Sequence, residues 1–155
     1  MIDLERLHQD LVRLETELWN TLDARLRVEN GLPLTWFMVM RYLAQRPGLR
    51  IQDIAHEFAI TAGGTSKVID RIEAAGYCRR RPHPNDRRSA VVELTPDGLN
   101  VVSRAAEGFE AELRRQVGSA ASEQSLTQFA ATLSALRSAL SSPAGRRQTS
   151  DEPEA

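Results

Sequence analysis

The stretch PHPNDRRSAVVELT, from Pro82 to Thr95, decides the fold, because it places an arginine-rich turn between two segments with strand-like alternation. It therefore predicts a β-hairpin with a charged tip. Two amphipathic helical segments precede it between Ile51 and Ala75. The order helix, tight turn, helix, strand, basic loop, strand is that of a winged helix-turn-helix, a mainly α fold with a small β-hairpin wing.

Helical patterns lie on both sides of this unit. Leucines recur at spacings of three and four from Leu4 to Leu26, which predicts a long amphipathic helix that ends before Pro33. The nearly all-apolar segment from about Leu34, stopped by Pro47 and Gly48, suits a central helix covered on several sides.

Thr95 and Pro96 follow the hairpin as an N-cap and a first-turn proline, and predict a helix to about Val117. The segment GSAASEQS then interrupts the pattern. A leucine stripe from Leu126 to Leu140 predicts a last helix.

Composition limits the class of protein. With 155 residues, 41% of them hydrophobic, the chain can bury a core without disulfides or metals, and we expect one structural unit. The net charge of −1 conceals a local cluster of arginines, so the distribution of charge matters more than the sum. That cluster comprises Arg79, Arg80, Arg81, Arg87 and Arg88.

The chain shows no sign of export or membrane insertion. A single cysteine, Cys78, is compatible with a reducing compartment, the amino terminus is charged throughout, and no long apolar run occurs. We therefore expect a cytoplasmic protein without a membrane segment.

The helix after Thr61, its N-cap, is expected to have two distinct faces. Thr65, Val68, Ile69 and Ile72 lie in one sector and should face the core. Residues on the opposite side are small or polar: Gly63, Lys67, Asp70 and Ala74, flanked by Gly64, Ser66 and Arg71.

A helix that enters the major groove of DNA needs a small, polar surface at its N-terminal half. Gly63 and Gly64 reduce helix propensity, so they indicate close approach of another backbone, although a frayed helix start would explain them too. Thr65 could instead be half-buried. The candidate DNA contacts on this helix are Thr61, Gly63, Gly64, Thr65, Ser66, Lys67 and Arg71.

The wing supplies two further candidate DNA contacts, Arg87 and Arg88, of which Arg88 is placed to enter the minor groove. An aspartate among arginines would repel DNA, so Asp86 is expected to pair with Arg88 and fix its direction. The alternative is a solvated Asx-type turn formed by Asn85 and Asp86, and both roles could coexist.

The wing sequence DRRS, in the context RIEAAGYCRRRPHPNDRRSAVVELTPDG, resembles the MarR family of bacterial transcription regulators. Asp86, Arg88 and Ser89 match the family's wing pattern, and the resemblance covers residues from about 4 to 141. It implies a homodimer that binds pseudo-palindromic promoter DNA, usually as a repressor, and that responds to a small, often phenolic or anionic, ligand.

The terminal helices carry leucine stripes that the central unit does not need for its own core. A two-fold partner with the same stripes would cover them, which favours a homodimer over an intrachain bundle. The expected division is a dimerisation helix at 1–33, a DNA-binding lobe at 34–95, dimerisation helices at 96–141 and a disordered tail at 142–155.

A ligand pocket is a separate prediction. Trp19, Trp36, Phe37 and Met40 lie on the first two helices, near the place where the resembled family forms a cavity. They could line a pocket for a small aromatic or anionic effector, although apolar residues at helical spacing are more often simple core.

Other chemistries find little support in the sequence. Cys78 follows Gly76 on an expected strand and is assigned a structural role rather than that of a thiol switch. His8, His56 and His83 lack metal-site spacing, and no phosphate loop or nucleophile motif occurs, so we expect no metal, no cofactor and no enzyme.

The sequence thus predicts a ligand-relieved transcriptional repressor. Two alternatives remain open: a DNA-binding activator or architectural factor that needs no effector, and a helical dimer that binds small molecules but not DNA. The basic wing argues against the last of these.

Overall fold

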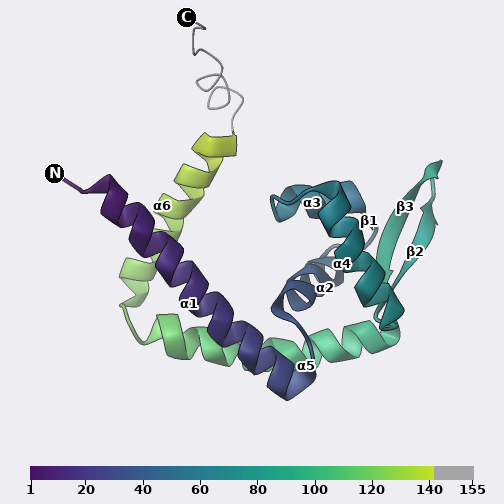
Figure 1. Ribbon diagram of the computed structural model, residues 1–155, viewed down its shortest axis with the longest axis horizontal. Helices are drawn as coiled ribbons and strands as arrows, with labels where there is room; N and C mark the ends of the chain where they lie inside the picture. Colours follow the sequence, from purple (N-terminus) through teal and green to yellow (C-terminus); the bar gives the residue numbers. More distant parts are fainter. Residues whose placement is uncertain (142–155) are drawn as a thin grey trace, which may run out of the picture. The chain divides into compact units, whose positions relative to one another are not determined.

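A computed structural model describes residues 1–141, and the tail predicted to be disordered lies outside these residues. The chain packs as two compact units, Met1–Glu112 and the part from Leu113 onward. The first unit contains α1 (Leu4–Asn30), α2 (Leu34–Gln45), β1 (Leu49–Arg50), α3 (Ile51–Glu57), α4 (Ala62–Ala74), β2 (Cys78–His83), β3 (Asp86–Leu94) and nearly all of α5 (Pro96–Leu113). Figure 1 labels these elements.

The second unit contains a π-helical turn, η1 (Arg114–Gly118), and α6 (Glu123–Ser141). Ser122 caps α6, because its hydroxyl oxygen accepts a hydrogen bond of 3.2 Å from the backbone amide of Ser125. The π-helical turn continues α5, so the predicted helix to about Val117 is present with a change of winding at its end.

The helices of the first unit begin and end where the sequence predicts. Gly31 closes α1 in the left-handed conformation, with φ of 64°. The next helix, α2, is capped from a distance: Asp23 on α1 accepts a hydrogen bond of 2.8 Å from the backbone amide of Leu34. Burial would raise the pKa of Asp23, but its contacts with Arg27 and this amide lower it below the ordinary value.

The winged arrangement is confirmed, with one strand more than predicted. In the antiparallel sheet β3 lies between β1 and β2, with Leu49 opposite Val92 and Cys78 opposite Leu94. The two-residue strand β1 is too short to show an alternating pattern. The hairpin register shifts between Pro82 and His83, next to the tip.

The core lies between α2, α3, α4, the sheet and α5. As predicted, α2 is largely enclosed: Phe37, Val39 and Met40 are buried, as are Ile54 on α3 and Ile69 on α4. Only the C-terminal part of α1 contributes to this core. The boundary of the compact unit therefore differs from the functional division into arms and lobe, which remains a prediction.

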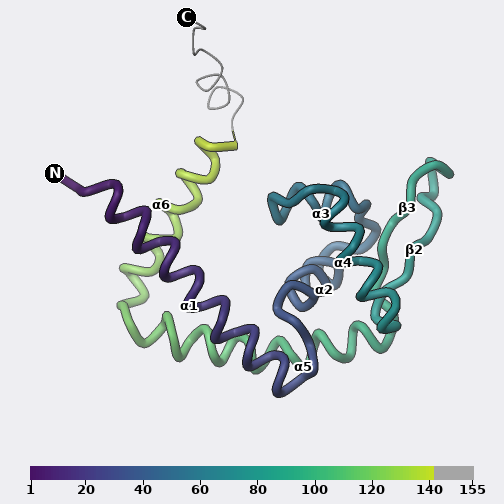
Figure 2. Tube along the Cα trace, viewed as in Figure 1, coloured from purple at the N-terminus to yellow at the C-terminus, as the bar shows by residue number. Residues whose placement is uncertain are grey.

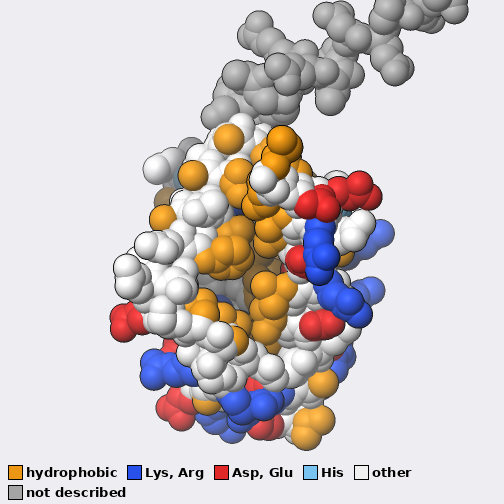
Figure 3. Space-filling model, turned by 90° about the vertical axis from the view of Figure 1, so that its left-hand side faces the viewer, with side chains coloured by type: hydrophobic (Ala, Val, Ile, Leu, Met, Phe, Trp, Pro, Cys, Tyr) orange, Lys and Arg blue, Asp and Glu red, His pale blue; other side chains and the backbone are white. Residues whose placement is uncertain are grey.

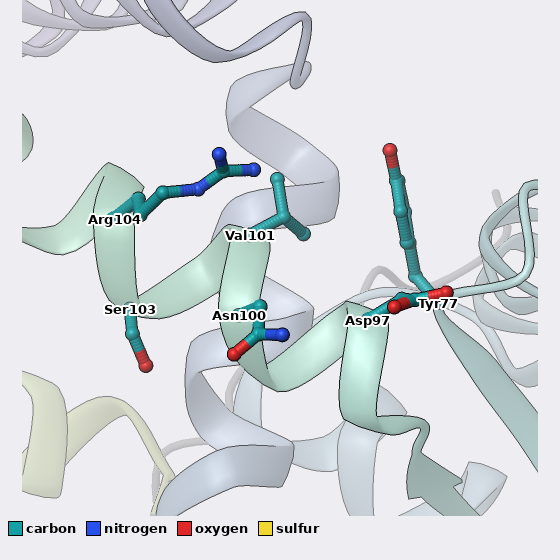
Figure 4. Close-up of a pocket in the computed structure, with 6 residues that line it drawn as sticks. All are labelled: Tyr77, Asp97, Asn100, Val101, Ser103 and Arg104. Carbon is teal, nitrogen blue, oxygen red and sulfur yellow. The ribbon is translucent and has the colours of Figure 1, made fainter.

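A tight joint connects the turn after α4 to the start of α5. The amide of Thr95 donates to the carbonyl of Tyr77 at 3.0 Å, and the Thr95 hydroxyl donates to the carbonyl of Gly76 at 2.6 Å. Figure 2 shows the chain passing from β3 into α5 at this point. Figure 4 shows Tyr77 beside Asp97 in the first turn of α5, where they border a hollow of about 510 Å³.

Candidate nucleic-acid interface

The start of α4 is capped by Thr61, the predicted N-cap. Its side-chain oxygen accepts a hydrogen bond of 3.0 Å from the backbone amide of Gly64. The alternative of a frayed helix start is therefore not what the structure shows. Since its hydroxyl oxygen already accepts the cap hydrogen bond, Thr61 can offer DNA its O–H donor and one remaining acceptor lone pair.

The outward face of α4 has the predicted residues. Gly63, Lys67, Asp70 and Ala74 are exposed, and Arg71 beside them is exposed as well. A Cβ at Gly63 would meet nothing within 4 Å, so the fold itself does not require glycine there. A Cβ at Gly64 would lie 3.1 Å from the Thr61 hydroxyl, so a side chain there would crowd the cap. This contact explains a glycine at position 64 without any approach of DNA.

Thr65 must be removed from the set of predicted DNA contacts. Its side chain is fully buried, and its hydroxyl donates a hydrogen bond of 3.0 Å to the carbonyl of Thr61. The helical periodicity had already placed Thr65 with Ile69 and Ile72 on the core side, and that assignment is correct. Its neighbour Ser66 is partly exposed.

The wing presents Arg87 and Arg88 as exposed side chains at the start of β3. Asp86 accepts a hydrogen bond of 3.0 Å from the backbone amide of Arg88. The predicted pairing with the Arg88 guanidinium is therefore replaced by an Asx-type contact with the backbone, which was the alternative reading. Asp86 thus stabilises the turn that carries Arg88 and does not hold the Arg88 guanidinium.

The five clustered arginines have three different environments: two face Glu93, one contacts α4, and Arg87 and Arg88 form no ion pair with residues 1–141. Arg79 and Arg81 both face Glu93 on β3, at 3.7 Å and 2.9 Å. Arg80 contacts two carboxylates of α4. Sequence reasoning missed these pairings, because the partners of a strand residue across a sheet or on a neighbouring helix are not visible in local sequence.

Four basic side chains remain available on this surface. Lys67 and Arg71 on α4, and Arg87 and Arg88 on the wing, form no ion pair with any residue between 1 and 141. Figure 1 shows α4 beside the β2–β3 hairpin, and Arg80 links the two directly. Cations from two adjacent elements, next to an exposed glycine, form a surface suited to a polyanion.

The four predicted ligand-pocket residues are not brought together. Met40 is fully buried in the core, whereas Trp19 lines a shallow groove on α1 with Glu15 and Asn20. Trp36 is half-buried and lines none of the hollows described for residues 1–141. Of the four, Phe37 alone lines an apolar hollow.

That hollow, of about 230 Å³, lies between α2, the end of α3, and α5. Phe37 packs against Phe109 with ring centres 4.7 Å apart, and Tyr42 meets Phe58 edge-on at 5.7 Å. Arg41 stands at its margin and contacts Glu110 at 3.0 Å. The sequence analysis identified Phe37 only: Tyr42 lies on the same helix, whereas Phe58 and Phe109 come from two other segments of the chain.

Cys78 lies buried at the start of β2, in the structural position that was predicted. Burial, aided by the charge of Glu73 and opposed by Arg80, raises the pKa of its thiol to about 11. Across residues 1–141 no helix is long and apolar enough to cross a membrane.

Residues 30–89 match the family model described as MarR family, and they include α2, α3, α4 and the tip of the wing. This segment of the chain is similar to the MarR family. Among curated proteins, the chain is 36% identical over 80 residues to the HTH-type transcriptional regulator PecS of Dickeya dadantii, covering 52% of this chain and 48% of PecS. It is 29% identical over 79 residues to the HTH-type regulator YfiV of Bacillus subtilis, covering 51% and 49%.

The chain thus spans about half the length of these curated relatives. Solved structures extend the agreement in fold. Sco3205 of Streptomyces coelicolor, a MarR family regulator solved with DNA, has a TM-score of 0.84 at 24% identity, with 92% of each chain covered. CouR of Rhodococcus jostii, solved with p-coumaroyl-CoA, has a TM-score of 0.74 at 20% identity, with 81% and 87% covered.

Proposed function

We propose that this protein is a sequence-specific, double-stranded-DNA-binding transcriptional regulator, with α4 in the major groove and Arg88 in the minor groove. The observation that carries the proposal is the set of cations that form no ion pair with residues 1–141, Lys67 and Arg71 on α4 and Arg87 and Arg88 on the wing. The relative Sco3205, of the same fold, was solved in complex with DNA. A protein that acts on promoter DNA in this way works in the cytoplasm.

The acting form is a homodimer built from the terminal helices. Leu4, Leu7 and Leu14 on α1 are exposed, and so are Leu136 and Leu140 on α6. Figure 3 shows hydrophobic side chains on the side where α1 begins. Because such stripes are costly to leave in water, a second copy that buries them would be stabilised, and its wing would reach a second half-site about one DNA turn away.

Repression relieved by a ligand follows from this geometry. A dimer binds both half-sites tightly only when the spacing of its two lobes matches the DNA, so a ligand that favours another spacing lowers affinity. The hollow beside Phe37, Phe109 and Arg41 is the candidate site for a small aromatic or anionic effector. CouR, the relative solved with p-coumaroyl-CoA, is the precedent for an aromatic acyl ligand in this fold.

Fluorescence anisotropy on the promoter DNA upstream of the protein's own gene tests this function. Wild-type protein is expected to bind with a steep salt dependence, because it releases counterions from phosphates. Lys67→Ala and Arg88→Ala should weaken binding about tenfold. Arg79→Ala is the matched control, since Arg79 faces Glu93 and not the proposed DNA surface.

A panel of aromatic acids, added to the bound complex, then separates the alternatives. Release of DNA supports ligand-relieved repression, and binding unaffected by every acid favours an effector-independent factor. Absence of saturable binding by the wild-type protein would contradict the DNA-binding function itself.

A further inference from the structure

Arg80 on β2 is the one basic residue that the structure ties to α4 among residues 1–141. Its guanidinium donates a hydrogen bond of 2.5 Å to Asp70 and a second hydrogen bond to Glu73. Its backbone amide donates a third, of 2.9 Å, to the other oxygen of Glu73. Asp70 and Glu73 are three positions apart and therefore adjacent on one side of the helix.

These contacts are partly shielded from water. The Arg80 side chain is 27% exposed, and Glu73 is 37% exposed. Burial alone would lower the pKa of Arg80, but the hydrogen bonds to Asp70 and Glu73 outweigh it and raise the pKa. The planar guanidinium can serve two carboxylates at once, which a lysine ammonium on a flexible stem does less well.

Asp70 is the member of this cluster that matters for a polyanion. It is 61% exposed and follows Gly63 and Lys67 on the outward face of α4 at helical spacing. An uncompensated carboxylate there would repel DNA phosphates. Contact with Arg80 compensates that charge and turns the carboxylate toward the wing.

Neighbouring arginines cannot replace Arg80. Successive side chains of a strand point to opposite faces of the sheet, so Arg79 and Arg81 face Glu93 instead of α4. Among residues 1–141, Arg80 is therefore the position of β2 that forms ion pairs with α4, whereas the thiol of Cys78 reaches only a backbone carbonyl of that helix. Arg79, of the same residue type and one position away, is a natural control.

We propose that Arg80 is a positioning residue that holds α4 and the wing as one DNA-binding surface and compensates the charge of Asp70 on that surface. The inference rests on the proposed DNA-binding function. It assigns to Arg80 no contact with DNA, which distinguishes it from the four unpaired cations. Its loss should therefore be felt through Asp70.

A double-mutant cycle between positions 70 and 80 tests this role. The probe is a duplex selected by the wild-type protein from a random-sequence pool, and affinity is measured at low and high salt. Arg80→Ala should weaken binding about tenfold, and Arg79→Ala and Asp70→Asn about twofold or less. Adding Asp70→Asn to Arg80→Ala should restore about threefold, more at low salt than at high salt.

Thermal unfolding of each variant shows whether the fold is retained. A purely structural role of Arg80 would not give a salt-dependent recovery of DNA affinity by Asp70→Asn, so that recovery distinguishes positioning from general loss of structure. If Arg80→Ala fails to fold, Arg80→Lys serves in its place, with about a fivefold loss expected since it keeps the charge but not the two-carboxylate contact. In that case Asp70→Asn is combined with Arg80→Lys.

Two results would overturn the inference and leave the proposed function intact. One is an equal loss of DNA affinity from the alanine substitutions at positions 79 and 80. The other is no recovery of affinity when Asp70→Asn is added to Arg80→Ala, which would indicate direct contact between Arg80 and DNA. A wild-type protein that selects no duplex would instead overturn the proposed function, and this inference with it.

Discussion

Gly98, in the first turn of α5, lies directly against the backbone of Tyr77: a Cβ at position 98 would be 2.0 Å from the Tyr77 carbonyl oxygen. No real Cβ tolerates such a distance, and the obstacle is backbone rather than a flexible side chain. The same carbonyl accepts the hydrogen bond from Thr95. The joint between the turn after α4 and the start of α5 therefore requires glycine at this position.

Gly98→Ala should accordingly destabilise the protein, by about 1 to 3 kcal/mol, because the helix start must move away from Tyr77. Urea denaturation followed by circular dichroism measures the loss. Unchanged stability would show that the joint is loose in solution.

Gly63→Ala is expected to behave in the opposite way toward stability. A Cβ at Gly63 meets nothing within 4 Å, and alanine is the better helix former, so the free energy of unfolding should stay equal or rise by up to about 1 kcal/mol. If DNA approaches α4 closely at this point, affinity should fall in the same variant. Measuring both quantities on one preparation decides the matter, and undiminished affinity would remove Gly63 from the interface.

Several of these features follow from local sequence and several do not. The Thr61 cap, the Gly31 helix end and the hairpin are specified by neighbouring residues, so the sequence predicts them. Glu112 shows the limit: it belongs to an amphipathic helix, yet its side chain is buried and contacts Arg25 on α1 at 2.5 Å. Such a contact depends on how two distant helices meet.

The candidate site divides in the same way. The exposed Lys67, Arg71 and Arg88 are found from helical periodicity and the wing pattern. The role of Asp86 toward the Arg88 backbone depends on turn geometry, and that of Arg80 on a neighbouring element. Local patterns thus identify the surface, and tertiary packing decides which of its charges are free.

Asp23 should make stability depend on pH in the acid range. Its pKa is lowered from the ordinary value of 3.8, so the carboxylate form is favoured by folding, and its contribution is present above that value and lost as pH falls through the folded pKa. Asp23→Ala should cost about 1 kcal/mol at neutral pH, since α2 loses its cap. Urea titrations from pH 7 to about pH 3 should show the two proteins converging. A constant difference across that range would contradict the assignment.

Cys78 should be unreactive in the folded protein. With a pKa of about 11 and a buried side chain, little thiolate is present or accessible at neutral pH. A disulfide reagent such as Ellman's reagent should label it slowly in the native state and quickly in urea. Rapid labelling of the native protein, with loss of DNA binding, would instead support a thiol switch.

The central claim is that α4 and the wing contact DNA together, and hydroxyl-radical footprinting of wild-type protein and Arg88→Ala on one selected duplex tests it most directly. The account predicts that the wild-type dimer protects two half-sites about one turn apart together with adjacent minor-groove positions, and that Arg88→Ala loses only the minor-groove protection. Identical footprints for the two proteins would contradict it.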